Sequence, residues 1–186
     1  MANHNCVEPA QQNAADRSIV LAPAGDSITF PAVDSCFAIC LALSDGTLLG
    51  GHVPVFFDDA AFGIEMSKVG FAGRKGGAHD PQEGGMAVSL DRIIDMMNTV
   101  RGDRAAMVTI TLGDAEWADL WDARRGRIGF GKQIRYQKAT GPRNLIVDLA
   151  TSRIRVQRRL GGVYLNQVAA ERRLNQGTIT GTPIGI

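Results

Sequence analysis

The chain has 186 residues, of which 45% are hydrophobic and 21% charged, and its formal net charge is +1. This length suits one hydrophobic core, and the composition is that of a globular domain rather than a disordered or fibrous chain. No apolar run approaches the ~20 residues that span a bilayer, and the polar start lacks the features of a secretory signal. We therefore expect no membrane partner and a cytoplasmic location, or a secreted effector exported by another route.

The first elements are predicted from changes in hydrophobic pattern. Residues 1–25 show no periodicity and are expected to form a flexible N-terminal extension to a single domain over 26–186. Two apolar runs, 35–43 and 47–57, flank Ser44-Asp45-Gly46. A three-residue loop with glycine last is typical of a β-hairpin whose glycine adopts the left-handed conformation.

The rest of the chain mixes short helical and strand patterns. The patterns predict a long surface loop over 58–85, helices that begin near Ser89, Asp114 and Pro142, strands over 105–112, 128–136 and 153–157, and a closing hairpin over 163–179. Gly102 is expected to end the first of these helices. Pro142 suits the first turn of a helix that carries Leu145, Ile146 and Leu149. Because the strands and helices lack a regular βαβ rhythm, we expect the α+β class.

Charged residues and cysteines limit the kinds of partner and cofactor. Thirteen Lys/Arg stand against three Asp/Glu from Trp121 to Ile186. This excess indicates either ordinary solvated faces or a basic surface that attracts an acidic partner, and the scarcity of aromatic residues there argues against nucleic acid. Cys6, Cys36 and Cys40 are too few for a disulfide framework, and no ligand spacing supports a metal site.

Cys36 and His52 are the candidate chemical pair, because a nucleophilic cysteine requires a base within hydrogen-bond reach. If Gly46 closes a three-residue loop, Ala38 pairs with His52, and Cys36 becomes a diagonal neighbour of His52 on the same face, with Cβ atoms roughly 7 Å apart. A two-residue loop would place the two side chains on opposite faces. The alternative is that both are ordinary core residues, a description that suits Cys40 better than Cys36 at the strand entrance.

These residues also match the pattern of a known family. Ser35-Cys36 at the mouth of an apolar strand and Gly50-Gly51-His52 after the hairpin resemble the chemoreceptor glutamine deamidase (CheD) family and its relatives, the cytotoxic-necrotizing-factor type of cysteine deamidases. Further resemblances follow in order at Leu90–Val100, Ala105–Leu112, Gly141-Pro142-Arg143-Asn144, Ile154–Val156, Gly161-Gly162 and Gly177. In the family, a threonine six residues before the cysteine orients the histidine. That position is Phe30 here, and Thr29 lies one residue away.

The resemblance implies a sandwich of two mixed β-sheets flanked by helices, in α/β/β/α layers, and a reaction without a cofactor or metal. Cys36 would attack the carboxamide of a glutamine, with His52 as base and Thr29 or a backbone carbonyl as the third member, while Ser35 would support the oxyanion. The implied partner is a protein substrate with an exposed glutamine, such as a chemoreceptor or another signalling protein. Two alternatives are a non-catalytic signalling adaptor with the same scaffold and a toxin-type deamidase or transglutaminase that acts on host proteins.

Overall fold

The computed structural model describes residues 4–7, 18–55, 85–129, 131–138, 141–148, 153–158 and 184–185. Their elements, in chain order, are β1 (His4–Cys6), β2 (Ile19–Ala22), β3 (Ser27–Val33), β4 (Phe37–Leu43), β5 (Leu48–Val53), α3 (Gly85–Arg101), β6 (Ala106–Gly113), α4 (Glu116–Arg124), the 3₁₀ turn η2 (Arg125–Arg127), β7 (Lys132–Gln137), β8 (Arg143–Asp148), β9 (Arg153–Arg158) and β10 (Ile184–Gly185). The expected loop over 58–85 and the hairpin over 163–179 lie almost wholly outside these residues.

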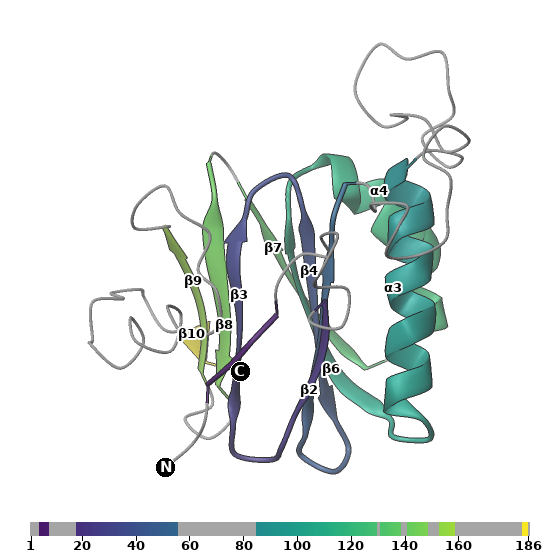
Figure 1. Cartoon of the computed structure of the whole chain (residues 1–186), viewed down its shortest axis with the longest axis vertical. Coiled ribbons are helices and arrows are strands. Elements are labelled where there is room, and N and C mark those ends of the chain that lie inside the picture. The colour runs from purple at the N-terminus through teal and green to yellow at the C-terminus, as the bar shows by residue number, and fades with distance from the viewer. Residues whose placement is uncertain are drawn as a thin grey trace.

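The strands form two mixed sheets, which fits a two-sheet sandwich and confirms the α+β class (Figure 1). The outer sheet has the order β1-β3-β8-β9-β10, and the central sheet has the order β2-β5-β4-β6-β7. Each sheet contains one parallel pair, β1 with β3 and β6 with β7. Helices α3 and α4 lie on the face of the central sheet that points away from the outer sheet (Figure 1). Among the described residues, no helix covers the far face of the outer sheet.

Strand β4 lies in the middle of the central sheet and divides its side chains between two cores. Successive strand residues point to opposite faces, and both faces of β4 are buried. The helix-side core takes Phe37, Ile39, Leu41 and Leu43, while the inter-sheet core takes Ala38, Cys40 and Ala42. The large side chains of β4 therefore pack against the helices, and the small ones face the outer sheet.

The predicted hairpin and its register are confirmed. β4 pairs antiparallel with β5, from Phe37 opposite Val53 to Ala42 opposite Leu48, and His52 lies opposite Ala38. Gly46 has φ +82°, the left-handed conformation that the three-residue loop requires. The glycine at the third loop position was thus sufficient to fix the register.

The prediction of a loose extension over 1–25 is wrong for the part that the structure describes. His4–Cys6 pairs in parallel with β3, and Ile19–Ala22 pairs antiparallel with β5. Cys6, at the end of β1, is buried. Short strands of three and four residues leave too little sequence for a periodic pattern, so pairing with longer strands decides their conformation.

The prediction of a helix from Pro142 is also wrong, because Arg143–Asp148 forms strand β8. This strand pairs antiparallel with β3 on one side and β9 on the other, and it sends Leu145 and Val147 into the inter-sheet core. Tertiary pairing on both edges outweighs the local preference of proline for a first helical turn. The helix expected from Ser89 begins earlier, at Gly85, and ends as expected before Gly102, whose φ is +58°.

Candidate active site

Cys36 lies in the short connection between β3 and β4, where two other elements hold the backbone. The indole nitrogen Nε1 of Trp117, on α4, donates a hydrogen bond of 2.9 Å to Ser35 O. Lys138, just after β7, places Nζ 3.0 Å from Asp34 Oδ1. Cys36 itself is half-buried. The connection is therefore fixed from both sides.

The sulfur of Cys36 accepts hydrogen bonds from two neighbouring groups. The donors are the backbone N–H of Val55, just beyond β5, and the hydroxyl of Ser35. Both donors favour a negatively charged sulfur. Ser35, predicted to support an oxyanion, thus contacts the nucleophile itself in this structure.

His52 is fully buried on β5, and a backbone carbonyl fixes its orientation. Nδ1 lies 3.0 Å from Val7 O. Because a carbonyl oxygen can only accept, Nδ1 carries the hydrogen and Nε2 holds the free electron pair. Nε2 has no hydrogen-bond partner within the described part of the chain. His52 lies opposite Ala38, two residues after Cys36, and the paired register begins at Phe37, one residue beyond Cys36. The same face for Cys36 and His52 is what continued strand alternation would give, and it stays a prediction.

The glycine before the Gly51-His52 step creates the space that this arrangement needs. A Cβ atom at Gly50 would lie 2.7 Å from Val7 Cγ2 and 3.0 Å from Phe30 Cζ. The Phe30 ring in turn meets the His52 ring edge-on, with centroids 6.1 Å apart. Without a side chain at Gly50, both Val7 and Phe30 approach the histidine from the outer sheet.

Thr29 does not orient His52 through its hydroxyl, contrary to the prediction. Its side chain points away from the inter-sheet core, since its neighbours Ile28 and Phe30 both face that core. Thr29 acts through its backbone, whose carbonyl accepts the N–H of Val7 at 2.8 Å. The group that contacts His52 Nδ1 is the backbone carbonyl of Val7. Sequence reasoning did not name Val7, because the segment around it has no pattern of its own.

Burial dominates the ionisation of both groups. Burial raises the pKa of the Cys36 thiol to about 11 and Asp34 raises it further, against the hydrogen bonds from Val55 and Ser35 and the charge of Lys138. Burial lowers the pKa of His52 to about 4, opposed by the hydrogen bond to Val7. At neutral pH the resting pair is therefore a thiol and a neutral imidazole rather than a thiolate and an imidazolium.

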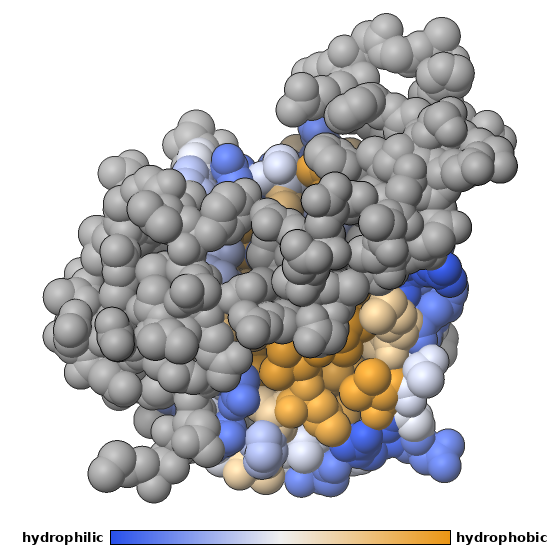
Figure 2. All heavy atoms as spheres, viewed as in Figure 1, coloured by the Kyte–Doolittle hydropathy of each residue, from blue (hydrophilic) through white to orange (hydrophobic). Residues whose placement is uncertain are grey.

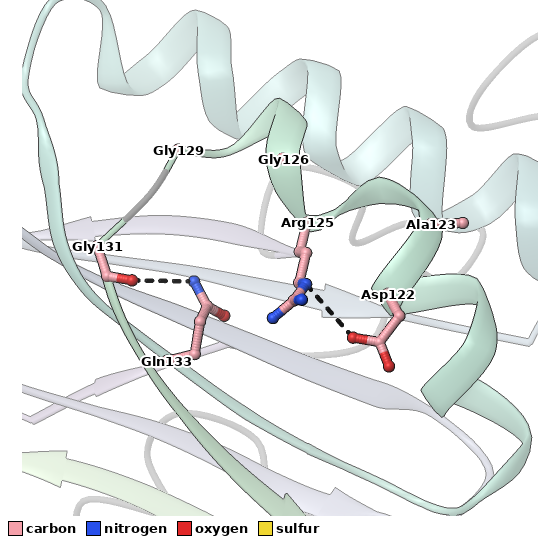
Figure 3. Close-up of a pocket in the computed structure, with 7 residues that line it drawn as sticks. All are labelled: Asp122, Ala123, Arg125, Gly126, Gly129, Gly131 and Gln133. Atoms are coloured by element: carbon pink, nitrogen blue, oxygen red, sulfur yellow. Dashed lines mark hydrogen bonds and ion pairs between the residues drawn. The ribbon is translucent and has the colours of Figure 1, made fainter.

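The Cys36–His52 pair is separate from a surface hollow of about 420 Å³ between α4, η2 and β7 (Figure 3). In this hollow the side chains of Arg125 and Gln133 point toward each other. Gln133 pairs with Thr109 near the start of β7, whereas Cys36 lies at the other end of the sheet, beyond Ala38 and its partner Leu112. The hollow is thus several residues along the strands from the thiol.

An apolar area on the surface is likewise distant from Cys36. Figure 2 shows this area where Figure 1 places β2, and Leu21 of that strand is 38% exposed. Leu21 pairs with Leu49, next to the hairpin turn, and the turn is at the opposite end of β5 from Val55. The area belongs to the edge of the central sheet and not to the candidate site.

Much of the basic charge after Trp121 is neutralised within the fold. The ion pairs are Arg124 and Arg127 with Asp91, Arg127 with Asp95, Arg125 and Arg135 with Asp122, and Lys138 with Asp34. The acidic partners come mostly from α3 and α4. These pairs favour the interpretation of an ordinary solvated surface over that of a basic docking face.

Comparison with known proteins adds no relative. No protein-family model matches the chain, and no curated protein matches it. Among the described residues, no cluster of three or more His, Cys, Asp or Glu side chains is arranged to hold a metal ion. The helices of that part of the chain are too short or too polar to cross a membrane.

Proposed function

We propose that this protein is a cysteine-dependent amidohydrolase of the CheD type that converts a glutamine side chain of a protein substrate to glutamate and releases ammonia. The observation that carries the proposal is the orientation of His52. Its Nδ1–H is held by Val7 O at 3.0 Å, its Nε2 is without a partner among the described residues, and it lies opposite Ala38, two residues after Cys36. A base oriented by a third group beside a nucleophile is the arrangement that covalent acyl chemistry requires.

The neutral resting pair defines how the first step would proceed. The Cys36 sulfur attacks the carboxamide carbon while its proton passes to Nε2 of His52, so that a C–S bond forms and the carbonyl oxygen becomes an oxyanion. In the resting structure the sulfur is bonded to Val55 N–H and the Ser35 hydroxyl. Substrate binding must therefore rotate the thiol toward Nε2 or place one water between them, as is common for sites that tighten only in the substrate complex.

The second half of the reaction returns each group to its starting state. The His52 imidazolium gives its proton to the departing nitrogen, ammonia leaves, and a thioester remains on Cys36. Water then attacks the thioester with His52 as base, the C–S bond breaks, and the thiol recovers its proton while glutamate is released. The N–H of Val55 and the hydroxyl of Ser35, which act on the Cys36 sulfur, are our candidate donors for the oxyanion. The resemblance to the CheD family supports two further parts of the proposal. One is a helical layer on the far face of the outer sheet, as in the family sandwich, and the other is a signalling protein as the substrate.

The test is ammonia release from a glutamine-containing protein such as casein, with the site of conversion read by mass spectrometry. We expect Cys36→Ala and His52→Ala to abolish release, with circular dichroism of native type. The matched control is Cys40→Ala, which removes a fully buried thiol from the adjoining strand β4 and should retain activity. Activity that survives Cys36→Ala would end the proposal. Incorporation of an added primary amine in place of water would identify a transglutaminase instead.

A second candidate function, a non-catalytic signalling module, is favoured by the raised thiol pKa and the lowered imidazole pKa. In that case Cys36 and His52 stabilise the core and have no chemical role. Iodoacetamide labelling separates the two candidates at neutral pH. A catalytic pair predicts that His52→Ala slows the alkylation of Cys36, whereas a structural pair predicts that the rate is unchanged or rises as the site loosens.

A further inference from the structure

Lys138 is a charged residue at the Cys36 end of the central sheet that the proposed mechanism does not use. Its backbone N–H donates to Gly113 O at 2.7 Å, which continues the β6–β7 pairing one residue beyond Gln137. Its side chain is only 8% exposed, and Nζ lies 3.0 Å from Asp34 Oδ1. Lysine side chains are rarely buried to this degree unless they are paired. The fold thus fixes one positive charge beside the connection that carries Cys36.

The charges around Cys36 act on its sulfur in opposite directions. Asp34 disfavours the negatively charged form and Lys138 favours it. The same ammonium also acts on the carboxylate of Asp114, which begins the turn into α4. His52, the titratable group on β5, is neutral near pH 7 and supplies no positive charge there. Within the described residues, Lys138 is therefore the positive charge that acts on this sulfur.

We propose that Lys138 is a positioning residue for the chemistry of Cys36, in which its ammonium, held in place by Asp34, stabilises the negative charge that forms on sulfur when the thiol proton leaves. A fixed charge that is already in place costs no reorganisation when the charge develops. The catalytic use of this charge rests on the proposed function, whereas the effect on the thiol does not depend on any substrate.

Lys138 and Asp34 differ in solvent exposure, so removal of each charge should change the reactivity of the Cys36 thiol differently. The Asp34 carboxylate is 61% exposed and the Lys138 stem is almost buried. Removal of the lysine charge should therefore leave a less reactive thiol. Removal of the aspartate charge should leave a more reactive one, because the buried stem keeps the ammonium near its position after the carboxylate is gone.

The experiment measures the rate of iodoacetamide labelling of Cys36 against pH, resolved by residue with mass spectrometry, on the full chain. We expect Lys138→Met to slow labelling at neutral pH by roughly three- to tenfold, as loss of one partly screened charge implies. Lys138→Arg should restore most of the rate, and Asp34→Asn should increase it. The matched control is Lys132→Met, an exposed lysine at the other end of β7, which should have no effect.

Two comparisons decide between a charge effect and a packing effect. Equal slowing in Lys138→Met and Lys138→Arg, or no change in either, would overturn the proposal. If Lys138→Met does not fold, as accelerated labelling of the buried Cys40 would reveal, the Asp34→Asn rate decides in its place, and an unchanged rate overturns the proposal. Ammonia release by the wild-type protein is measured in parallel. Its absence would remove the deamidase function without touching the charge effect on Cys36.

Discussion

The two cores on either side of the central sheet differ in the size of the side chains that they receive from β4. The helix-side core receives one phenylalanine and three large aliphatic residues, and Phe37 stacks on Trp117 with ring centroids 5.4 Å apart. The inter-sheet core receives only Ala38, Cys40 and Ala42. Small residues let the outer sheet approach closely enough for the carbonyl of Val7 to reach a buried histidine. The large side chains on the helix side of β4 therefore stabilise the strand, while the small ones on the inter-sheet side leave room for the imidazole of His52.

The largest loss of stability is expected in the helix-side core, from Trp117→Ala, which should lower the free energy of unfolding by about 3–5 kcal/mol. The indole is fully buried and stacks on Phe37, and Nε1 also holds Ser35 O at 2.9 Å. Trp117→Phe keeps a stacked ring but removes the donor and the smaller ring of the indole, for which we expect a loss of about 1–2 kcal/mol. Urea denaturation measures both variants. Equal losses would show that the hydrogen bond, and not the helix-side packing, holds the Cys36 connection.

The next effect concerns the buried imidazole of the inter-sheet core and its dependence on pH. Because burial lowers the pKa of His52 from 6.5 to about 4, the unfolded chain binds a proton in that range before the folded chain does. The stability contributed by the neutral imidazole is therefore complete above about pH 6.5 and falls as the pH falls toward 4, by roughly 3 kcal/mol in total.

Denaturation between pH 7 and pH 4 checks this dependence. His52→Leu should remove that part of the slope while the slope from carboxylates remains. It should also lower stability at pH 7 by about 1–3 kcal/mol, because leucine removes the Nδ1–H donor from the buried carbonyl of Val7. An unchanged slope in His52→Leu would mean that His52 titrates normally in the folded protein.

Two adjacent glycines sharpen the comparison, because each faces a different core. A Cβ at Gly50 would meet Val7 and Phe30, whereas one at Gly51 would meet Met97 Sδ and Ile93 on α3. Gly50→Ala and Gly51→Ala should each lower stability by about 1–3 kcal/mol. Only Gly50→Ala should alter the ¹⁵N chemical shifts of the His52 ring, because it displaces Val7 from Nδ1. A shift of equal size in Gly51→Ala would show that the two cores are coupled through β5.

The smallest effect is expected at Ala32 in the outer sheet, where the backbone is strained. Ala32 has φ +52°, and its N–H donates to Asn144 Oδ1 at 2.8 Å. The left-handed conformation costs a non-glycine residue roughly 1–2 kcal/mol. Ala32→Gly should therefore stabilise the protein by about 0.5–1 kcal/mol after the entropy of the unfolded glycine is subtracted. If Ala32→Gly lost stability instead, the backbone strain would lie at another residue of the β3 bulge and not at Ala32.

Local sequence signals succeeded where one residue type has a single structural solution. Gly46 at the end of a three-residue loop predicted the hairpin and its register. Gly102 predicted the end of α3. They failed at β1 and β8, whose conformations depend on the strands beside them. Asn144, noticed only as part of a motif, holds the strained backbone at Ala32, a contact between residues 112 positions apart.

The sequence by itself determined the β4–β5 hairpin and the two residues of the candidate pair, because turn geometry and strand alternation act over a few neighbouring residues. Tertiary structure alone decided that Val7 O orients His52 and that Thr29 contributes only its backbone. It also decided that Lys138 lies against Asp34. These contacts join segments far apart in the chain, and the cost of burying their polar groups, rather than any local preference, selects the partners.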